Sequence, residues 1–329
     1  MAVTLKDIAR ECGVAVSTVS NILNNHATSF ASEEVRQKVR EAVERLGYKK
    51  DYLSASLRTR TTQSIGLILD QIHDITRQDF LVPFVEQFSS LGYEVALAEH
   101  RKDADRAVAS LEGFAERYKD GVILFTDLLG QPDEVEEKLL RAVAASPLKI
   151  LGIGSRLRGQ VPSLDIDRGR AVEASLEHFF AAGHQSILVV YEYDWDMRPQ
   201  YSLWEQPGIT YWGGTHTVGD FLRRAEAADW TKFDAVFFRT DRIAIPAMRF
   251  FEARHIRVPD DLEVISFDNF AFSEYSSPAL TTWDIGFHRL GSRAQELLAS
   301  WLKGDELARD HYELFLPVFV PRQSHRGEL

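Results

Sequence analysis

The sequence of 329 residues contains a single cysteine, Cys12. One thiol cannot form a disulfide within the chain, which excludes the disulfide frameworks of small secreted domains. No run of 18 apolar residues occurs, so no segment is suited to cross a membrane. The N-terminal stretch "MAVTLKDIARECG" also lacks the apolar region of a signal peptide. These absences predict a protein of the cytoplasm.

Sequence patterns of catalytic and metal sites are absent as well. We find no nucleophile elbow, phosphate-binding loop or H-E-x-x-H motif. His178, His184 and His216 do not have the spacing of metal ligands. We therefore expect no catalytic residue, no metal, no cofactor and no enzymatic activity.

Negative charge dominates the chain, with a net charge of −11, but it is unevenly distributed. Residues 1–60 hold 10 Lys and Arg against 7 Asp and Glu, a net charge of +3. The remaining 28 basic and 42 acidic residues give residues 61–329 a net charge of −14. A small basic head on an acidic body is the asymmetry expected when only the head meets nucleic acid.

Three short helical patterns occupy the head. Thr4 and Asp7 resemble a capping box that opens a first helix, whose apolar stripe ends at Cys12 before a Gly13 turn. A second helix, within "VAVSTVSNILN" (14–24), turns apolar residues inward and short polar ones outward. A third helix runs from Ser32 to Gly47.

Two short helices around a glycine turn, backed by a third, indicate a helix-turn-helix unit. The second helix of such a unit enters the major groove, where short polar side chains reach base edges. The alternative is a plain three-helix cap whose polar face is only solvated. Cys12 lies on the apolar stripe, where we expect packing and not redox chemistry.

The stretches "VTLKDIARECGVAVSTVSNILN" and "RQKVREAVERLGY" resemble the N-terminus of lactose-repressor (LacI) family regulators. In that family the residues that match Val16, Ser17 and Asn21 read bases. The family usually has Ser at Ala15, so an N-cap worth about 1 kcal/mol is missing here. The DNA contacts that we expect come from Thr4, Val16, Ser17, Thr18, Asn21, Asn24, Tyr48, Leu57 and Arg58.

The segment "KKDYLSASLR" (49–58) is similar to the family's hinge helix, in which a leucine from each subunit wedges into the minor groove. Leu57 matches that leucine, and such a wedge bends the duplex. Packing between two hinge helices is the other role that we expect for Leu57. Lys50, Asp51 and Ala55 replace the family's Pro, Asn and Arg. Basic residues here, among them Arg58, supply phosphate contacts or belong to a solvated linker.

Eight short apolar runs alternate with helical patterns in the body and predict β-strands. Near-continuous apolar strands separated by helices are typical of parallel sheets that are covered on both faces. Two series of strands predict two lobes, hence an α/β core of two doubly wound parallel sheets. The first series is 64–70, 93–98, 120–125 and 149–154, and the second is 163–167, 186–191, 234–238 and 262–267.

The body resembles a type I periplasmic-binding-protein core, whose chain crosses between the lobes three times. The resemblance is carried by "LDIDRGRAVEASLEHFFAAGHQSILVV", "FDAVFFRTDRIAIPAMRFFEARHIRVPDDLEVISFDNF" and "SPALTTWDIGFHRLGSRAQELL". Leu280–Thr282 resembles the crossing back to the first lobe. We expect a helix-turn-helix domain (1–48), a hinge helix and linker (49–61) and an effector-binding and dimerisation core (62–329). Its first lobe would take 62–158 and 285–312, and its second lobe 159–284 and 313–329.

Ligands of such folds bind beyond the carboxyl ends of the strands. Asp241 and Asp268 each follow a predicted strand, and a carboxylate there can accept hydrogen bonds from two vicinal hydroxyls of a sugar. In the family, the residues that match Thr240 and Asp268 contact the effector. Capping of the following helix is the alternative role of Asp241.

Other candidates follow from the family pattern and its departures. The loop after the family's first strand binds effector, which indicates His73, Gln78 and Phe80. The family's cleft arginine is matched by Arg198, with about two residues deleted. Seven aromatic residues lie in 191–212; they cover a shortened lobe, with one or two such as Trp195 or Trp212 facing the ligand. Gly152 stands where the family has an effector-binding Asp.

Together these features predict a DNA-binding transcriptional regulator that acts as a repressor. It would bind palindromic operator DNA as a homodimer, with a tetramer left open, and it would respond to a carbohydrate effector. The alternatives are a regulator with a non-sugar effector or none, and a solute-binding receptor without DNA function. No membrane partner is expected.

Overall fold

The computed structural model describes residues 3–23, 31–48, 61–72, 75–117, 119–126, 133–154, 157–192 and 206–327. The chain divides into two compact units, Met1–Thr62 and Gln63–Leu329. The predicted hinge helix lies almost entirely outside the described residues. None of the described helices is long and apolar enough to cross a membrane.

The described residues of the first unit form three helices, α1 (Leu5–Cys12), α2 (Val16–Leu23) and α3 (Glu33–Leu46), in the places that the sequence predicts. Gly13 and Gly47 end α1 and α3 with φ of 69° and 64°, a left-handed conformation that favours glycine. Ile8, Val19 and Val39 have no exposed surface, one from each helix. The three apolar stripes therefore meet in one small core.

The second unit contains two six-stranded sheets. The first sheet has the order β11-β5-β4-β3-β1-β2, and every pairing in it is parallel. Its strands are β1 (Ser64–Leu69), β2 (Glu94–Glu99), β3 (Gly121–Phe125), β4 (Lys149–Ile153), β5 (Ser163–Ile166) and β11 (Tyr312–Phe315).

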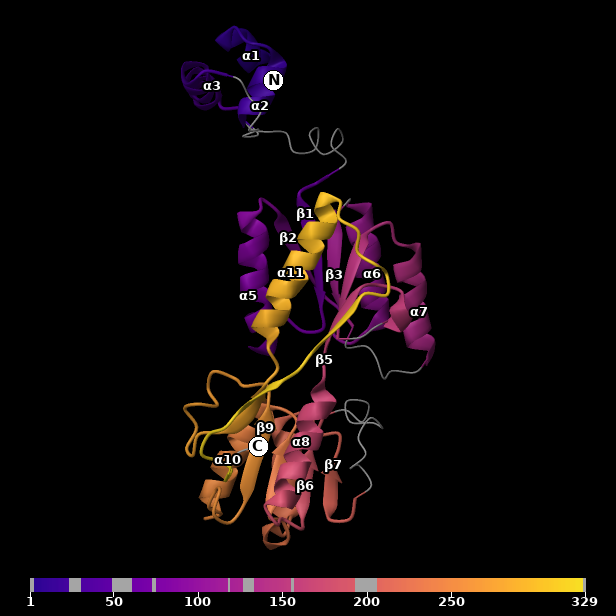
Figure 1. Ribbon diagram of the computed structural model, residues 1–329, viewed down its shortest axis with the longest axis vertical. Coiled ribbons are helices and arrows are strands. Elements are labelled where there is room, and N and C mark those ends of the chain that lie inside the picture. The colour runs from indigo at the N-terminus through magenta and orange to yellow at the C-terminus, as the bar shows by residue number, and fades with distance from the viewer. Residues whose placement is uncertain are drawn as a thin grey trace. The chain divides into compact units, whose positions relative to one another are not determined.

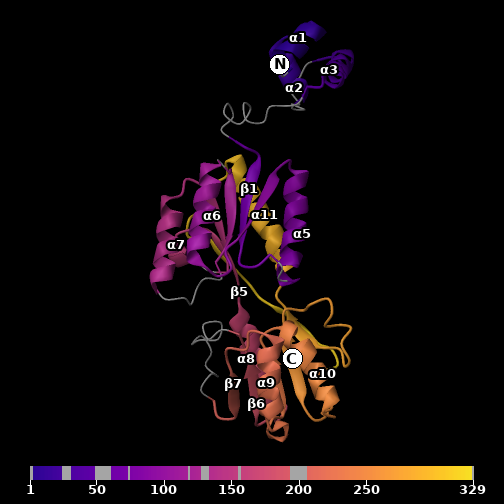
Figure 2. The same cartoon turned by 180° about the vertical axis from the view of Figure 1, so that it is seen from behind.

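Helices cover both faces of the first sheet (Figures 1 and 2). On one face lie α5 (Ile75–Ser90) and α11 (Phe287–Lys303), which pack against each other through residues such as Phe80 and Gly291. On the other face lie α6 (Ala104–Glu116) and α7 (Asp133–Ala145). A short 3-10 turn, η1 (Leu157–Gly159), follows β4. This is the covered parallel sheet that the apolar strands predict.

The second sheet has the order β12-β10-β9-β8-β6-β7 and is parallel except for β12, which runs antiparallel to β10. One face is covered by α8 (Arg168–Ala181), and the other by α9 (Val218–Ala227) and α10 (Asp241–Ala253) (Figures 1 and 2). A 3-10 turn, η3 (Trp230–Lys232), precedes β8. The strands are β6 (Ile187–Val190), β7 (Ile209–Trp212), β8 (Ala235–Phe238), β9 (Glu263–Phe267), β10 (Thr281–Asp284) and β12 (Val318–Val320). The predicted fold class, a head on two parallel sheets, is thereby confirmed.

Two of the three crossings between the lobes lie later in the chain than the sequence predicts. β5 pairs with β4 and β11, so the first crossing follows Ile166 and not residue 158. β11 also belongs to the first sheet, so the third crossing follows Phe315 and not residue 312. The segment taken for the second crossing, Leu280–Thr282, still belongs partly to β10, and the chain leaves that sheet after Asp284. Sheet membership depends on hydrogen-bonded partners, and one of the two partners of β5, β11, lies far downstream in the sequence.

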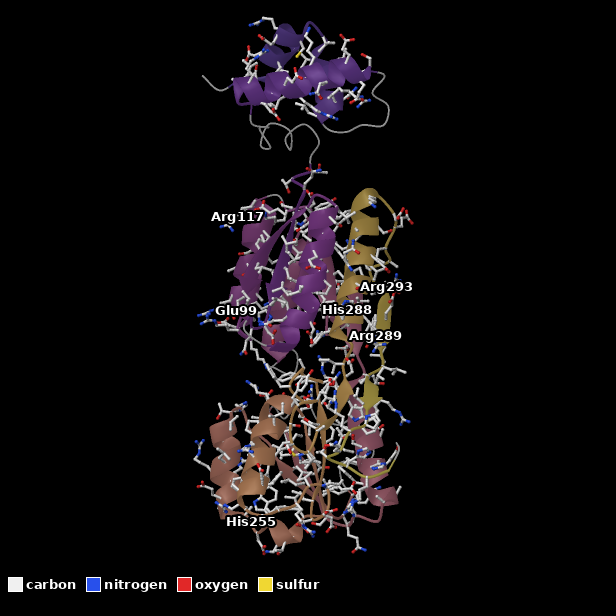
Figure 3. The ribbon with its side chains drawn as sticks, turned by 90° about the vertical axis from the view of Figure 1, so that its left-hand side faces the viewer. Glu99, Arg117, His255, His288, Arg289 and Arg293 are labelled. Carbon is white, nitrogen blue, oxygen red and sulfur yellow. The ribbon has the colours of Figure 1, made fainter. Side chains whose placement is uncertain are left out.

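The third crossing is held against α11 by two arginines that Figure 3 labels. Arg293 donates from Nε and Nη2 to the Glu313 carboxylate of β11, at 2.7–3.1 Å. These hydrogen bonds hold the pKa of Glu313 below its usual range. Arg289 donates from Nη2 to the Leu316 carbonyl at 3.3 Å. A guanidinium fork on a carboxylate fixes orientation as well as distance, so the point where the chain leaves the first lobe is well defined.

A first prediction concerns the contact between β1 and α6. A Cβ built on Gly66 would lie 2.2 Å from Cδ2 of Phe114, so the ring occupies the space that a side chain would need. We expect Gly66→Ala to lower the free energy of unfolding by about 1–3 kcal/mol through overpacking. The matched control is Gly113→Ala in α6, where nothing lies within 4 Å of the added carbon. It should raise stability by up to about 1 kcal/mol through helix propensity. Urea denaturation measures both, and equal stability of the two variants would contradict the packing described.

Candidate nucleic-acid interface and effector site

The α2 helix presents a polar face. Val19 and Ile22 are buried in the head core, whereas Ser17 is exposed and Val16 keeps 40% of its surface exposed. Asn21 is half-buried and lies one helical turn after Ser17, so the two share a face. The face belongs to a single helix and carries short side chains, and the major groove of DNA admits such a helix.

The helix ends in this three-helix unit have the caps that the sequence predicts. Both the amide and the hydroxyl of Thr4 donate to Oδ2 of Asp7, at 2.9 Å and 2.6 Å. These hydrogen bonds lower the pKa of Asp7. At α2, the carbonyl of Ala15 accepts from the amides of Thr18 and Val19, so Ala15 occupies the N-cap without a side-chain acceptor. Tyr48 follows the end of α3 and packs against the head core.

In the second unit, the carboxyl ends of the strands of both sheets lie where the chain crosses between the lobes (Figure 1). β5 and β11 end where the chain leaves the first lobe, and β10 ends where it leaves the second. Because neighbouring parallel strands end at the same edge, the residues that follow them gather there. Ligands of open α/β sheets bind outside this edge.

Two polar side chains meet at the ends of β8 and β9. Thr240 is the N-cap of α10, and its Oγ1 accepts from the amide of Arg242 at 3.2 Å. The same hydroxyl donates to Oδ2 of Asp268 at 2.7 Å. Thr240 is buried and Asp268 is half-buried. The single hydroxyl proton of Thr240 is thus directed to Asp268, which is the acceptor that reaches the surface of the lobe.

Asp241 has no exposed surface and a different set of partners. Its Oδ2 accepts from the amide of Phe270 at 2.9 Å and from the hydroxyl of Ser273 at 2.5 Å. Its Oδ1 accepts from the hydroxyl of Thr282 at 2.8 Å. Burial raises the pKa of Asp241, while these hydrogen bonds oppose the shift. Asp241 therefore anchors the loop after β9 to β10.

The loop after β9 begins with two residues in an unfavourable backbone conformation. Asp268 has φ of 116° and Asn269 has φ of 57°. Non-glycine residues with such angles cost of order 1–3 kcal/mol each and concentrate at functional sites. The amide of Asp268 donates to the Trp283 carbonyl at 3.0 Å, which ties this backbone to β10. The candidate effector carboxylate is thus held in place by its surroundings.

Two family models match the chain. One describes bacterial regulatory proteins of the lacI family and matches residues 4–51; the other describes a periplasmic binding protein-like domain and matches residues 176–325. The chain belongs to the LacI family. Among curated relatives, catabolite control protein A of Priestia megaterium is 26% identical over 324 residues, which cover 92% of this chain and 93% of the relative. The transcriptional repressor PurR of Photobacterium profundum is 28% identical over 339 residues, 98% of each chain.

Among solved structures, the lac repressor dimer bound to operator and the anti-inducer ONPF has the same fold. Its TM-score is 0.80 at 20% identity, over 99% of this chain and 100% of that one. The LacI-family chain is accordingly a transcriptional regulator with a DNA-binding domain and an effector-binding domain. The relatives reported are regulators and not enzymes.

Of the DNA contacts expected for this LacI-family chain, six residues are described. Val16, Ser17, Thr18 and Asn21 come from α2 and its outward face, while Thr4 and Tyr48 mark the ends of the head. Asn24, Leu57 and Arg58 lie outside the described residues.

The expected effector contacts divide into three groups. Thr240 and Asp268 are brought together at the edge of the second sheet. Gln78 is exposed on α5, whereas Phe80 is fully buried between Phe84 and Phe125 and so belongs to the core. Trp212 packs edge-on against Trp230 and Phe233, which favours the covering role over a ligand face. His73 and Arg198 lie outside the described residues.

The edge of the first sheet carries side chains that the sequence analysis passed over. Asp70 follows β1 and is 3% exposed, and His100 and Thr126 follow β2 and β3 without exposed surface. The Lys102 amide donates to Nδ1 of His100, which leaves Nε2 to donate to the Phe125 carbonyl at 3.2 Å. The signal was available, because each residue directly follows an apolar strand, as Asp268 does.

The two carboxylates of the second sheet should respond differently to removal. Asp241→Ala would leave an amide and two hydroxyls buried without their acceptor, so we expect the free energy of unfolding to fall by about 2–4 kcal/mol. Asp268→Ala should lower it by less, about 1 kcal/mol, because it takes the acceptor from one hydroxyl, that of Thr240, and the carboxylate itself reaches solvent. Thermal and urea denaturation measure both variants. A larger loss for Asp268→Ala would show that the anchoring roles have been assigned in reverse.

Proposed function

We propose that this LacI-family regulator is a cytoplasmic repressor that binds a palindromic operator as a homodimer and is controlled by a sugar. The observation that carries the effector part is the pair of Thr240 and Asp268 at the carboxyl edge of the second sheet, 2.7 Å apart. The part on DNA rests on the exposed polar face of α2.

The dimer follows from the size of one recognition unit. A single helix-turn-helix half-site seldom provides enough specific affinity, whereas two half-sites related by a two-fold axis do. The solved lac repressor that shares the fold is a dimer on its operator. A second copy of this chain would accordingly supply the second half-site contact.

The sugar follows from the chemistry of Asp268. A half-buried carboxylate can accept hydrogen bonds from two adjacent hydroxyls, and Thr240 orients it through one oxygen. The solved lac repressor binds the anti-inducer ONPF. Control of DNA binding then requires that the sugar bind two arrangements of the protein with unequal affinity.

Base reading by α2 is tested at Asn21. Asn21→Ala should weaken binding to the operator by about 1–3 kcal/mol, the usual worth of a base contact, and leave binding to random DNA unchanged. Gln37→Ala is the control, because Gln37 lies on the exposed side of α3 with its amide on Glu41. Fluorescence anisotropy on an operator selected from a random library measures both. An equal loss on operator and random DNA would assign Asn21 to phosphate or to no contact.

Sugar control is tested with D-glucose, D-ribose, sucrose, cellobiose, adenosine and a set of amino acids, added to the protein–operator complex. At least one sugar should release or tighten the complex. Asp268→Ala should weaken that response by about 1–3 kcal/mol, because sugar hydroxyls lose their acceptor, and should bind operator normally without sugar. A response to adenosine alone, or an unchanged response of the variant, would refute the sugar proposal.

A further inference from the structure

The last described residues of the chain form a clip on the second sheet. We use "C-terminal clip" for Arg322–His325, which is separated from β12 by Pro321 alone. Ser324, without exposed surface, joins β9 and β10: its carbonyl accepts from the Val264 amide at 2.8 Å, and its hydroxyl accepts from the Thr281 amide at 2.8 Å. The clip is therefore a fixed part of the lobe that carries Asp268.

His325 anchors the far end of the clip. It is 5% exposed, and its Nδ1 lies 3.0 Å from the hydroxyl oxygen of Thr281. Its ring packs against Phe319 and His178, with centroids 5.3 Å and 5.1 Å apart. Burial holds the pKa of His325 below its ordinary value, so the ring stays uncharged at neutral pH.

Arg322, at the near end of the clip, reaches the loop after β9. Its amide donates to the Thr281 hydroxyl at 2.9 Å, and Nη1 donates to the Leu280 carbonyl at 2.8 Å. Its Nη2 donates to Oδ1 of Asn269 at 2.7 Å. The rigid planar guanidinium thus joins the start of β10 to the residue that directly follows Asp268.

Asn269 adopts a left-handed backbone conformation with φ of 57°, next to φ of 116° at Asp268. Asn tolerates its angle better than most residues do, so it is the backbone of Asp268 that depends on its surroundings. The amide of Asn269 has a long hydrogen bond, 3.3 Å, to the Thr282 hydroxyl. The hydrogen bond that Asn269 accepts from Arg322 is shorter, 2.7 Å, and its donor is a charged guanidinium. It is therefore the stronger of the two hydrogen bonds of Asn269.

We propose that Arg322 is a positioning residue of the effector site, which acts by fixing Asn269 and through it the backbone of Asp268. Arg322 does not itself contact the effector. The orientation of the Asp268 carboxylate toward two hydroxyls depends on that backbone, since a change in φ swings the side chain away from Thr240. The inference rests on the proposed role of Asp268 in effector binding.

The test uses Arg322→Met, which keeps the length of the side chain and removes its donors. Hydrogen exchange of the full-length protein, read on peptides that span 266–276, needs no effector. We expect exchange of the Asp268 and Phe270 amides to rise about tenfold, because Asn269 loses its charged hydrogen bond. The variant also loses the bond to the Leu280 carbonyl, so the thermal midpoint should fall modestly, while operator affinity without sugar should stay near that of the wild type.

The second readout is calorimetric titration with D-glucose, D-ribose, sucrose and cellobiose. We expect Arg322→Met to bind the responsive sugar about tenfold more weakly. Adding Asn269→Gly should restore both exchange and affinity, because glycine adopts a positive φ without the guanidinium. Arg326→Met is the matched control: Arg326 is exposed and pairs with Asp260, away from Asn269.

The two readouts separate the inference from the proposed function. If none of the four sugars binds the wild type, the sugar proposal fails, and the exchange measurement still decides the role of Arg322. Unchanged exchange in Arg322→Met overturns the inference even where a sugar binds. A double variant that stays as weak and as fast-exchanging as Arg322→Met also overturns it, because the guanidinium would then act by another route.

Discussion

The parallel register between β8 and β9 is the constraint on which the proposed effector site depends. Ala235 lies opposite Glu263 and Phe237 opposite Ile265, and the same offset carries Thr240 to Asp268. A shift of one residue would turn one of these side chains to the other face of the sheet. The register is held because both faces of both strands are buried, so a shifted pairing would leave the alternating side chains in the wrong layers. The hydrogen bond between Thr240 and Asp268 is thus a consequence of core packing.

The two aspartates near this edge, Asp241 and Asp268, differ in burial, and this difference decides which groups their carboxylates can bind. A buried carboxylate is tolerated only when its oxygens accept hydrogen bonds, and Asp241 has three acceptor contacts within the lobe. Its acceptor capacity is used inside the protein and is not presented to a ligand. Asp268 reaches solvent; its amide is bonded to β10, and the next residue, Asn269, is bonded to the C-terminal clip. Asp241 thus serves stability, whereas the proposed recognition falls to Asp268, 27 positions later in the chain.

The sequence predicts the head almost completely, because caps, glycine turns and apolar stripes are local signals. Thr4 with Asp7, Gly13 and Gly47 each act within a few residues. The body is harder wherever a partner is distant. β5 belongs to the first sheet through β4 on one side and the distant β11 on the other, and β10 to β12 are too short and too mixed in composition to be recognised alone. The expectation for Phe80 is wrong because the family pattern assigns it to a ligand-binding loop after the first strand, whereas it lies on α5 and packs against α11. The contact between Arg322 and Asn269 has no local sequence signal, because the two residues lie 53 positions apart.

The same contacts limit where the two lobes can move relative to each other. The third crossing is tied to α11 at Glu313 and Leu316 and to the second sheet from Val318 onward, which leaves Pro317 between the two anchors. The second crossing passes through Gly286, whose φ of 70° suits a bend and whose amide is held by Asp284 at 2.7 Å. Hinge motion in proteins is absorbed by a few residues between rigid elements. An effector held at Asp268 lies on the same rigid body as the clip, so its binding energy can act on the crossings only through contacts with the first lobe. For such an effector, the unequal affinity that regulation requires would have to come from contacts that the first lobe makes in one arrangement of the lobes and not in the other.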